Sequence, residues 1–226
     1  MQQNSDATRE IKVWDLPTRL FHWSLVILFG ISWASIELVD NAFNIHMYSG
    51  YAILVLVLFR LLWGIFGSTT ARFASFVRGV RTTIKYAATA MQLKPGNQIG
   101  HNPLGGWMIL FMLGLLLFQA VTGLFANDDI INEGPLVHWI SKDLSDILSG
   151  LHEGAFNFLL ALIGLHIAAV LFYRFFKREN LITPMITGNK SVSGKATPDL
   201  RFTSTWIALL LLGIAVAGVA LLVTRA

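Results

Sequence analysis

Leu151-His152-Glu153-Gly154-Ala155-Phe156-Asn157-Phe158-Leu159-Leu160-Ala161-Leu162-Ile163-Gly164-Leu165-His166 is the stretch that decides the fold, because it sets two histidines in one long apolar segment. The histidines are 14 residues apart. At about 100° per residue this is close to four helical turns, so both side chains leave the same face. At about 1.5 Å of rise per residue they lie roughly 21 Å apart, most of a hydrocarbon core of about 30 Å. We expect a membrane-spanning helix over 148–176 with an imidazole near each side of the bilayer.

The composition indicates an integral membrane protein. The 226 residues are 54% hydrophobic and only 13% charged, which a soluble domain does not show. Cysteine is absent, and this excludes disulfides, iron–sulfur clusters, covalent c-type haem and thiolate catalysis. A metal must then be held mainly by the six histidines. The net charge of +4 is no sign of nucleic-acid binding, because the Lys and Arg residues cluster in particular loops.

The apolar runs predict five membrane-spanning helices, at 20–36, 45–66, 104–125, 148–176 and 205–223. A basic start before an apolar run is also typical of a signal peptide. However, Trp33-Ala34-Ser35 is a poor cleavage site, so we expect the first helix to be retained. We therefore expect an all-α membrane protein.

The charges of the connecting segments alternate along the chain. Lys and Arg are frequent before the first helix, after the second and after the fourth, whereas 37–44 and 126–147 are acidic. The positive-inside rule then places the N-terminus in the cytoplasm and the C-terminus outside. In the basic segment 67–103, apolar residues at helical spacing predict either a helix on the membrane surface or a loop helix packed on protein. Residues 187–194 are interpreted as a flexible linker.

Four histidines pair by depth in this topology. His22 opens the first helix inside and is level with His166, and His46 opens the second helix outside and is level with His152. Neutral imidazole is a good axial ligand of haem iron, and ionisable groups at membrane depth are costly and usually functional. We therefore predict two bis-histidine b-type haems. A haem-free transporter with a histidine proton relay is the alternative from another class.

Other polar residues gather at the inner edge. Arg19 and Arg174, with Arg72 and Lys177, are candidates to pair with propionates of the inner haem, or they only mark the topology. His101 is interpreted as a contact of a haem propionate or a quinone, or as a residue that caps a helix or anchors a loop. His138 lies in the outer acidic loop and has no partner at its depth.

Several motifs resemble one known family. These are Val13-Trp14-Asp15-Leu16-Pro17-Thr18-Arg19-Leu20-Phe21-His22-Trp23, His46-Met47-Tyr48-Ser49-Gly50-Tyr51, Gly100-His101-Asn102-Pro103-Leu104-Gly105-Gly106-Trp107 and Leu151-His152-Glu153. In this order they resemble the bacterial di-haem cytochromes b, the prokaryotic cytochrome b-561 family, which includes the cytochrome b subunits of nickel–iron hydrogenases. The resemblance covers about residues 11–190 and leaves the fifth helix outside. It implies that four helices form a bundle holding two haems and that a fifth helix follows. This divides the chain into a domain over 1–190 and a linker with the fifth helix over 191–226.

The resemblance implies electron transfer between the quinone pool and a redox partner in the bacterial inner membrane, with His22, His46, His152 and His166 as the haem ligands. The acidic outer loop suits a periplasmic cytochrome c as the partner. The alternative is an anchor subunit that delivers electrons from a hydrogenase or dehydrogenase to quinone. No catalytic residue is assigned, and quinol oxidation is the one activity such a subunit would have. Gly213, Ala217 and Gly218 permit a helix contact in a homodimer.

Overall fold

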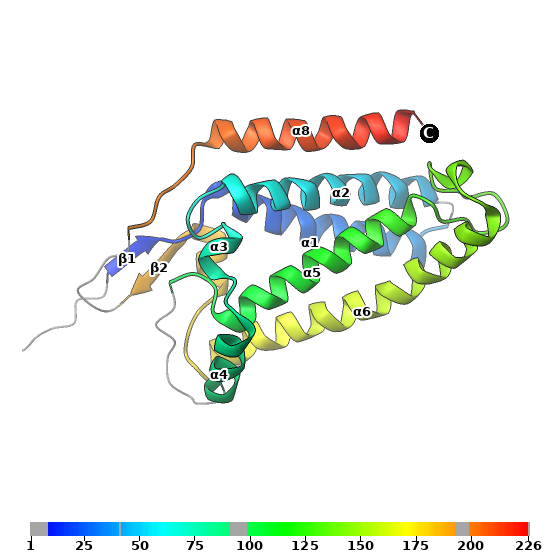
Figure 1. The fold of residues 1–226 in the computed structure, drawn as a ribbon. Coiled ribbons are helices and arrows are strands. Elements are labelled where there is room, and N and C mark those ends of the chain that lie inside the picture. The colour runs from blue at the N-terminus through cyan, green and yellow to red at the C-terminus, as the bar shows by residue number, and fades with distance from the viewer. Residues whose placement is uncertain (1–8, 41, 91–98, 193–198, 226) are drawn as a thin grey trace, which may run out of the picture.

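Five long helices run side by side in the computed structural model, which describes residues 9–40, 42–90, 99–192 and 199–225 (Figure 1). They are α1 (Leu16–Glu37), α2 (Phe43–Phe66), α5 (Pro103–Gly123), α6 (Lys142–Phe175) and α8 (Thr205–Thr224). Each is long and apolar enough to cross a membrane, although between 11% and 44% of its most apolar stretch is buried in the protein. The remaining apolar surface suits lipid and not water. The prediction of an all-α membrane protein with five spans is therefore confirmed.

Helix α2 lies at the centre of the packing. It contacts α1, α5 and α8, while α5 packs on α6. The buried core includes Trp63, Val57 and Leu159, none of which is exposed to solvent. Helix α8 lies along the outside of the other four and packs on α2 through Ala208, Leu211, Ala215 and Val219 (Figure 1). Gly213 and Gly218 have no neighbour within 4 Å of an added Cβ, so they lie away from this contact.

Two helices begin four or more residues earlier than predicted, because polar caps precede their apolar runs. Helix α6 starts at Lys142, six residues before the expected position, and the Ser141 side chain accepts the Leu144 N–H at its start. Part of the acidic segment is thus helical. Helix α1 starts at Leu16, where the Asp15 carboxylate accepts the Thr18 N–H at 2.8 Å.

The bundle has two distinct ends, which we call the sheet end and the acidic-loop end. At the sheet end, β1 (Arg9–Lys12) pairs antiparallel with β2 (Asn189–Val192), near α3 (Phe73–Phe76), α4 (Val80–Ala90) and α7 (Ile182–Thr187) (Figure 1). The acidic-loop end is formed by residues 124–141, with a short helix at Val137–Trp139. Residues 189–192 form strand β2, so the prediction of a flexible linker was wrong for them. The partner strand β1 lies far away in the sequence, so local sequence did not reveal the pairing. Residues 193 and 194 lie outside the described part.

The basic segment after α2 has a first part that packs on protein and a second, more exposed part. The Phe73 ring packs at Gly64, where any side chain would collide with it, and Phe76 is buried. This first part is therefore packed on protein. In α4, however, Val80 and Ile84 are 59% and 64% exposed. These apolar side chains are free to contact the membrane surface, and that contact stays a prediction. Lys94 lies outside the described residues.

Candidate functional site

His46 on α2 and His152 on α6 lie next to each other near the acidic-loop end. Their ring centroids are 6.1 Å apart, and the rings are nearly perpendicular. Nδ1 of His46 is 3.0 Å from the Ser32 carbonyl oxygen, and Nδ1 of His152 is 2.9 Å from the Gln119 carbonyl oxygen. A carbonyl accepts only, so each bond places the proton on Nδ1. Both Nε2 atoms are thereby left with a lone pair for a metal.

His22 on α1 and His166 on α6 form the second pair, nearer the sheet end. Their ring centroids are 6.5 Å apart. Nδ1 of His22 is buried and has no hydrogen-bond partner. Along α6, His166 is about 21 Å from His152 by the rise of the helix. The structure thus brings together the two pairs that the depth argument predicted, at two levels of the bundle.

The spacing of both pairs fits an ion between the rings. Two opposed imidazole nitrogens, each about 2 Å from a metal, place the ring centroids about 6 to 6.5 Å apart. Within the described residues no group of three or more His, Cys, Asp or Glu side chains is arranged to hold a metal ion. Each pair therefore offers two ligands from the described side chains, and an ion there needs its other ligands from another molecule, as a porphyrin would supply them. The residues present fit a bis-histidine haem at each level.

A family model described as prokaryotic cytochrome b561 matches residues 13–188. The chain belongs to the prokaryotic cytochrome b561 family. This confirms the resemblance seen in the sequence motifs. The match covers α1, α2, α5 and α6 with all four paired histidines, and it ends before α8. No curated protein and no solved structure gives a significant match.

Membership of the prokaryotic cytochrome b561 family establishes the general function. The family carries electrons across the membrane and typically binds haem b. The five apolar helices agree with a multi-pass membrane protein, and the family is bacterial.

The two arginines predicted to meet a propionate lie in different surroundings. Arg19 is half-buried, donates through Nη1 to the Ile186 carbonyl and lies close to Gly188. Arg174 is exposed in the last turn of α6. Both lie toward the sheet end, and their pairing with propionates stays a prediction.

The remaining two histidines are not close to each other. His101 lies between the rings of Trp14 and Phe76, with centroids 4.6 Å and 4.7 Å away, so it anchors the loop before α5. Asn102, and not His101, caps that helix, because its side chain accepts the Gly105 N–H. Burial, with the nearby charges of Arg60, His166 and His22, lowers the pKa of His101 to about 3. His138 is exposed and lies 3.5 Å from Glu133.

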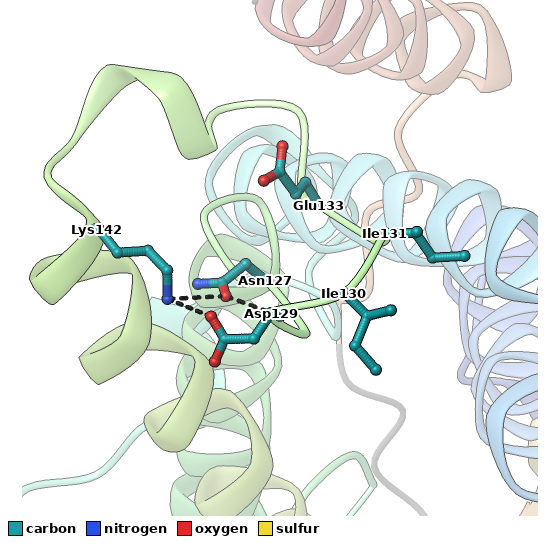
Figure 2. A pocket seen from close by; sticks show the side chains of 6 residues that line it. All are labelled: Asn127, Asp129, Ile130, Ile131, Glu133 and Lys142. Atoms are coloured by element: carbon teal, nitrogen blue, oxygen red, sulfur yellow. Dashed lines mark hydrogen bonds and ion pairs between the residues drawn. The ribbon is translucent and has the colours of Figure 1, made fainter.

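A pocket of about 320 Å³ opens in the acidic-loop end. It is lined by Asn127, Asp129, Ile130, Ile131, Glu133 and Lys142 (Figure 2). Lys142 bridges Asp129 and Asp146 in this region. Ile130 and Ile131 are each 83% exposed, so the pocket joins an apolar tip to acidic side chains. None of the lining residues is a histidine, and this feature belongs to the surface and not to the paired sites.

Arg60 is a charged residue near the end of the second predicted helix, to which the sequence analysis assigned no role. It is 2% exposed in α2, and its guanidinium carbon lies 5.0 Å from the centre of the Phe73 ring. A lone arginine inside an apolar run is a signal of function in a membrane helix. The same signal is present in the sequence, 14 residues after His46.

Proposed function

We propose that the chain transfers electrons through two b-type haems between the quinone pool and a partner at the outer face of the bacterial inner membrane. One observation carries this proposal: at two levels of a membrane bundle, two histidine rings lie with their centroids 6.1 Å and 6.5 Å apart, respectively. When bound, each haem supplies reversible one-electron chemistry. The two levels give the chain a site near each membrane surface.

We assign His46 and His152 to one haem and His22 and His166 to the other. The Ser32 and Gln119 carbonyls hold the rings of the first pair in orientation and keep the proton on Nδ1. With two histidines holding each haem, the iron would supply electron transfer and not oxygen chemistry. The histidines come from α1, α2 and α6, so the domain over 1–190 is the functional unit, and α8 contributes none of them.

The proposed orientation places the sheet end in the cytoplasm. At this end α2 is followed by four basic residues, Arg72, Arg78, Arg81 and Lys85, whereas residues 126–147 at the other end are acidic. This distribution follows the positive-inside rule. The N-terminus is then cytoplasmic and the C-terminus periplasmic.

A basic periplasmic cytochrome c suits the acidic-loop end as the partner. The exposed Ile130 and Ile131 lie beside Asp129 and Glu133 (Figure 2). An apolar centre with charges around it is the usual composition of a docking surface, and opposite charge speeds the encounter. Gly134 packs against the Gly123 and Leu124 carbonyls, which places this loop over the end of α5 that contacts His152.

The first test is a haem count on the purified full chain with a reduced-minus-oxidised absorption spectrum. We expect two haems b per chain. A colourless preparation from cells with an adequate haem supply would contradict the proposal and favour the proton-relay transporter. Reduction by quinol, followed by oxidation with a cytochrome c, then tests the direction. Reduction only by a hydrogenase or dehydrogenase would favour the anchor subunit.

The second test assigns the ligands. In His152→Ala the haem at the acidic-loop end should be lost, while the haem near the sheet end remains. His138→Ala is the matched control, because His138 is 82% exposed on the same end of the molecule. Retention of both haems in His152→Ala would remove His152 from the ligand set.

A further inference from the structure

Buried polar atoms without a hydrogen-bond partner gather toward the sheet end. In the described part of the chain six buried side-chain nitrogen or oxygen atoms have no partner, and five of them belong to Thr18, Arg19, His22, Arg60 and His101. Guanidinium groups donate only, and the hydroxyl and the imidazoles also have a proton to donate. Buried polar groups are normally paired, so this end lacks an acceptor.

Of these residues, Arg60 is the one that buries a positive charge. It is 2% exposed, and no carboxylate of the described residues lies within 4 Å of its guanidinium. The nearby Asp15 is already engaged, since one carboxylate oxygen accepts the Thr18 N–H at 2.8 Å and the other accepts the Trp63 indole N–H at 3.1 Å. A buried charge is retained only when it is paired, so a further anion is expected at Nη1.

The register of the helices places Arg60 beside the level of the second histidine pair. Ser32 contacts His46 and Asp15 contacts Trp63, so the start of α1 lies beside the end of α2. Thr18 is three residues after Asp15 and Arg60 is three residues before Trp63, so these two residues are level. Thr18 lies about one turn from His22, toward the sheet end. Arg60 follows His46 on α2 by the same 14 residues that separate His152 and His166 on α6. His101 lies in the same region of the molecule, since, besides its burial, the charges of Arg60, His166 and His22 each contribute to lowering its pKa.

We propose that Arg60 binds a propionate carboxylate of the haem held by His22 and His166, with His101 as a second donor. This inference rests on the di-haem function proposed above. Arginine pairs with a carboxylate through two parallel N–H bonds, which neutralises the buried charge and fixes the position of the ring edge. Arg19 already donates to the Ile186 carbonyl, and Arg174 is exposed to its surroundings. Both therefore need a carboxylate partner less than the buried Arg60 does.

The test uses the full chain from cells grown with δ-aminolaevulinic acid that places carbon-13 in the haem propionate carboxyls. Arg60→Gln should shift a labelled carboxylate band in the reduced-minus-oxidised infrared spectrum. It should also lower the reduction equilibrium constant of one haem by about tenfold, which is about 59 mV for a one-electron couple, because a nearby positive charge favours the reduced form. Arg81→Gln is the matched control, since Arg81 is exposed in α4 at the same end. It should leave both quantities unchanged.

Each outcome decides the matter. A haem-loaded Arg60→Gln protein with an unchanged labelled band would overturn the inference, even if its potential moved, because Arg60 would then act only as a distant charge. If this variant holds no haem at the sheet-end level, Arg60→Lys decides: we expect it to restore the haem with a shifted carboxylate band, and an unshifted band would overturn the inference. Wild-type protein without any haem would instead refute the di-haem function itself.

Discussion

Gly123, the last residue of α5, lies against the ring of the paired histidine His152. A Cβ at this position would lie 2.8 Å from Cε1 and 3.1 Å from Nδ1 of His152. In Gly123→Ala the ring must move and lose its bond to the Gln119 carbonyl. We expect the haem assigned to His46 and His152 to be lost, so that haem per chain falls by about half, as the pyridine haemochrome assay measures.

Gly114 in the same helix is the matched control for this variant. An added Cβ there has no neighbour within 4 Å, so Gly114→Ala should keep the full haem content. Alanine favours a helix over glycine by up to about 1 kcal/mol, so a loss seen only at Gly123 cannot come from helix propensity. Full haem content in Gly123→Ala would mean that His152 does not hold a haem in this orientation.

At the level of residues, the sequence was informative where spacing alone decides position. The 14-residue interval in α6 and the helix order were enough to bring His22 to His166 and His46 to His152. The hydrogen bonds that the Ser32 and Gln119 carbonyls accept from the two histidines were not predictable, since they depend on the rotation of α1 and α5 about their axes. Arg60 was overlooked because its surroundings, Phe73 and Asp15, come from segments distant in sequence.

At the scale of elements, the segment after α5 is closed by Asp128, whose carboxylate accepts the backbone N–H groups of Asn132, Ile130 and Ile131 at 2.9 to 3.0 Å. Bonds to the charged form lower the pKa of Asp128 to about 2. The folded pKa is below the unfolded one, so the carboxylate stabilises the loop above about pH 4, and this is lost as the pH falls through 2.

Hydrogen exchange of the amides of residues 130–132, corrected for its intrinsic pH dependence, measures this effect. Protection in the wild type should persist from neutral pH to about pH 3 and fall near pH 2. In Asp128→Asn it should be independent of pH below about 4, because no carboxylate titrates there. Loss of wild-type protection already at pH 4 to 5 would contradict the assigned bonds.

The long apolar helices were predictable as elements, and their ends were not. Hydropathy locates the part of a helix that lies in lipid, whereas α6 continues through Lys142, Asp143 and Asp146, which no apolar window includes. The strand pair β1–β2 was missed for a different reason. Each strand has four residues and pairs with a strand from the other end of the domain, so no local sequence pattern predicts the pairing.

At the scale of the whole molecule, the proposed division near residue 190 predicts what α8 does. A chain that stops after Val192 keeps β2 and all four paired histidines, so both haems should remain. It loses the packing of Ala208, Leu211, Ala215 and Val219 on α2, and the thermal midpoint in detergent should fall by several degrees. Stopping after Gly188 also removes the strand pair and should lower the midpoint further. Loss of haem in the longer form would show that α8 belongs to the functional unit.

The distribution of charge over the molecule decides how a soluble partner approaches. If the acidic-loop end receives a basic cytochrome c, the second-order rate of electron transfer should fall steeply as the ionic strength rises, because the Debye length is only about 10 Å at 0.1 M. Neutralising Glu133 and Asp143 together, as Glu133→Gln with Asp143→Asn, should lower the low-salt rate by about tenfold and flatten the salt dependence. These changes spare Asp128 and the Lys142 pairs that hold the loop.

Glu10→Gln with Asp199→Asn is the control for this charge change. It alters the net charge equally but at the sheet end, the far side of the membrane in the proposed orientation. Its salt dependence should match the wild type, because charges there are separated from the partner by the length of the bundle and by the bilayer. Equal effects of both double variants, measured by stopped flow in proteoliposomes, would mean that net charge and not the acidic loop guides the encounter. A larger effect of the sheet-end variant would reverse the proposed orientation.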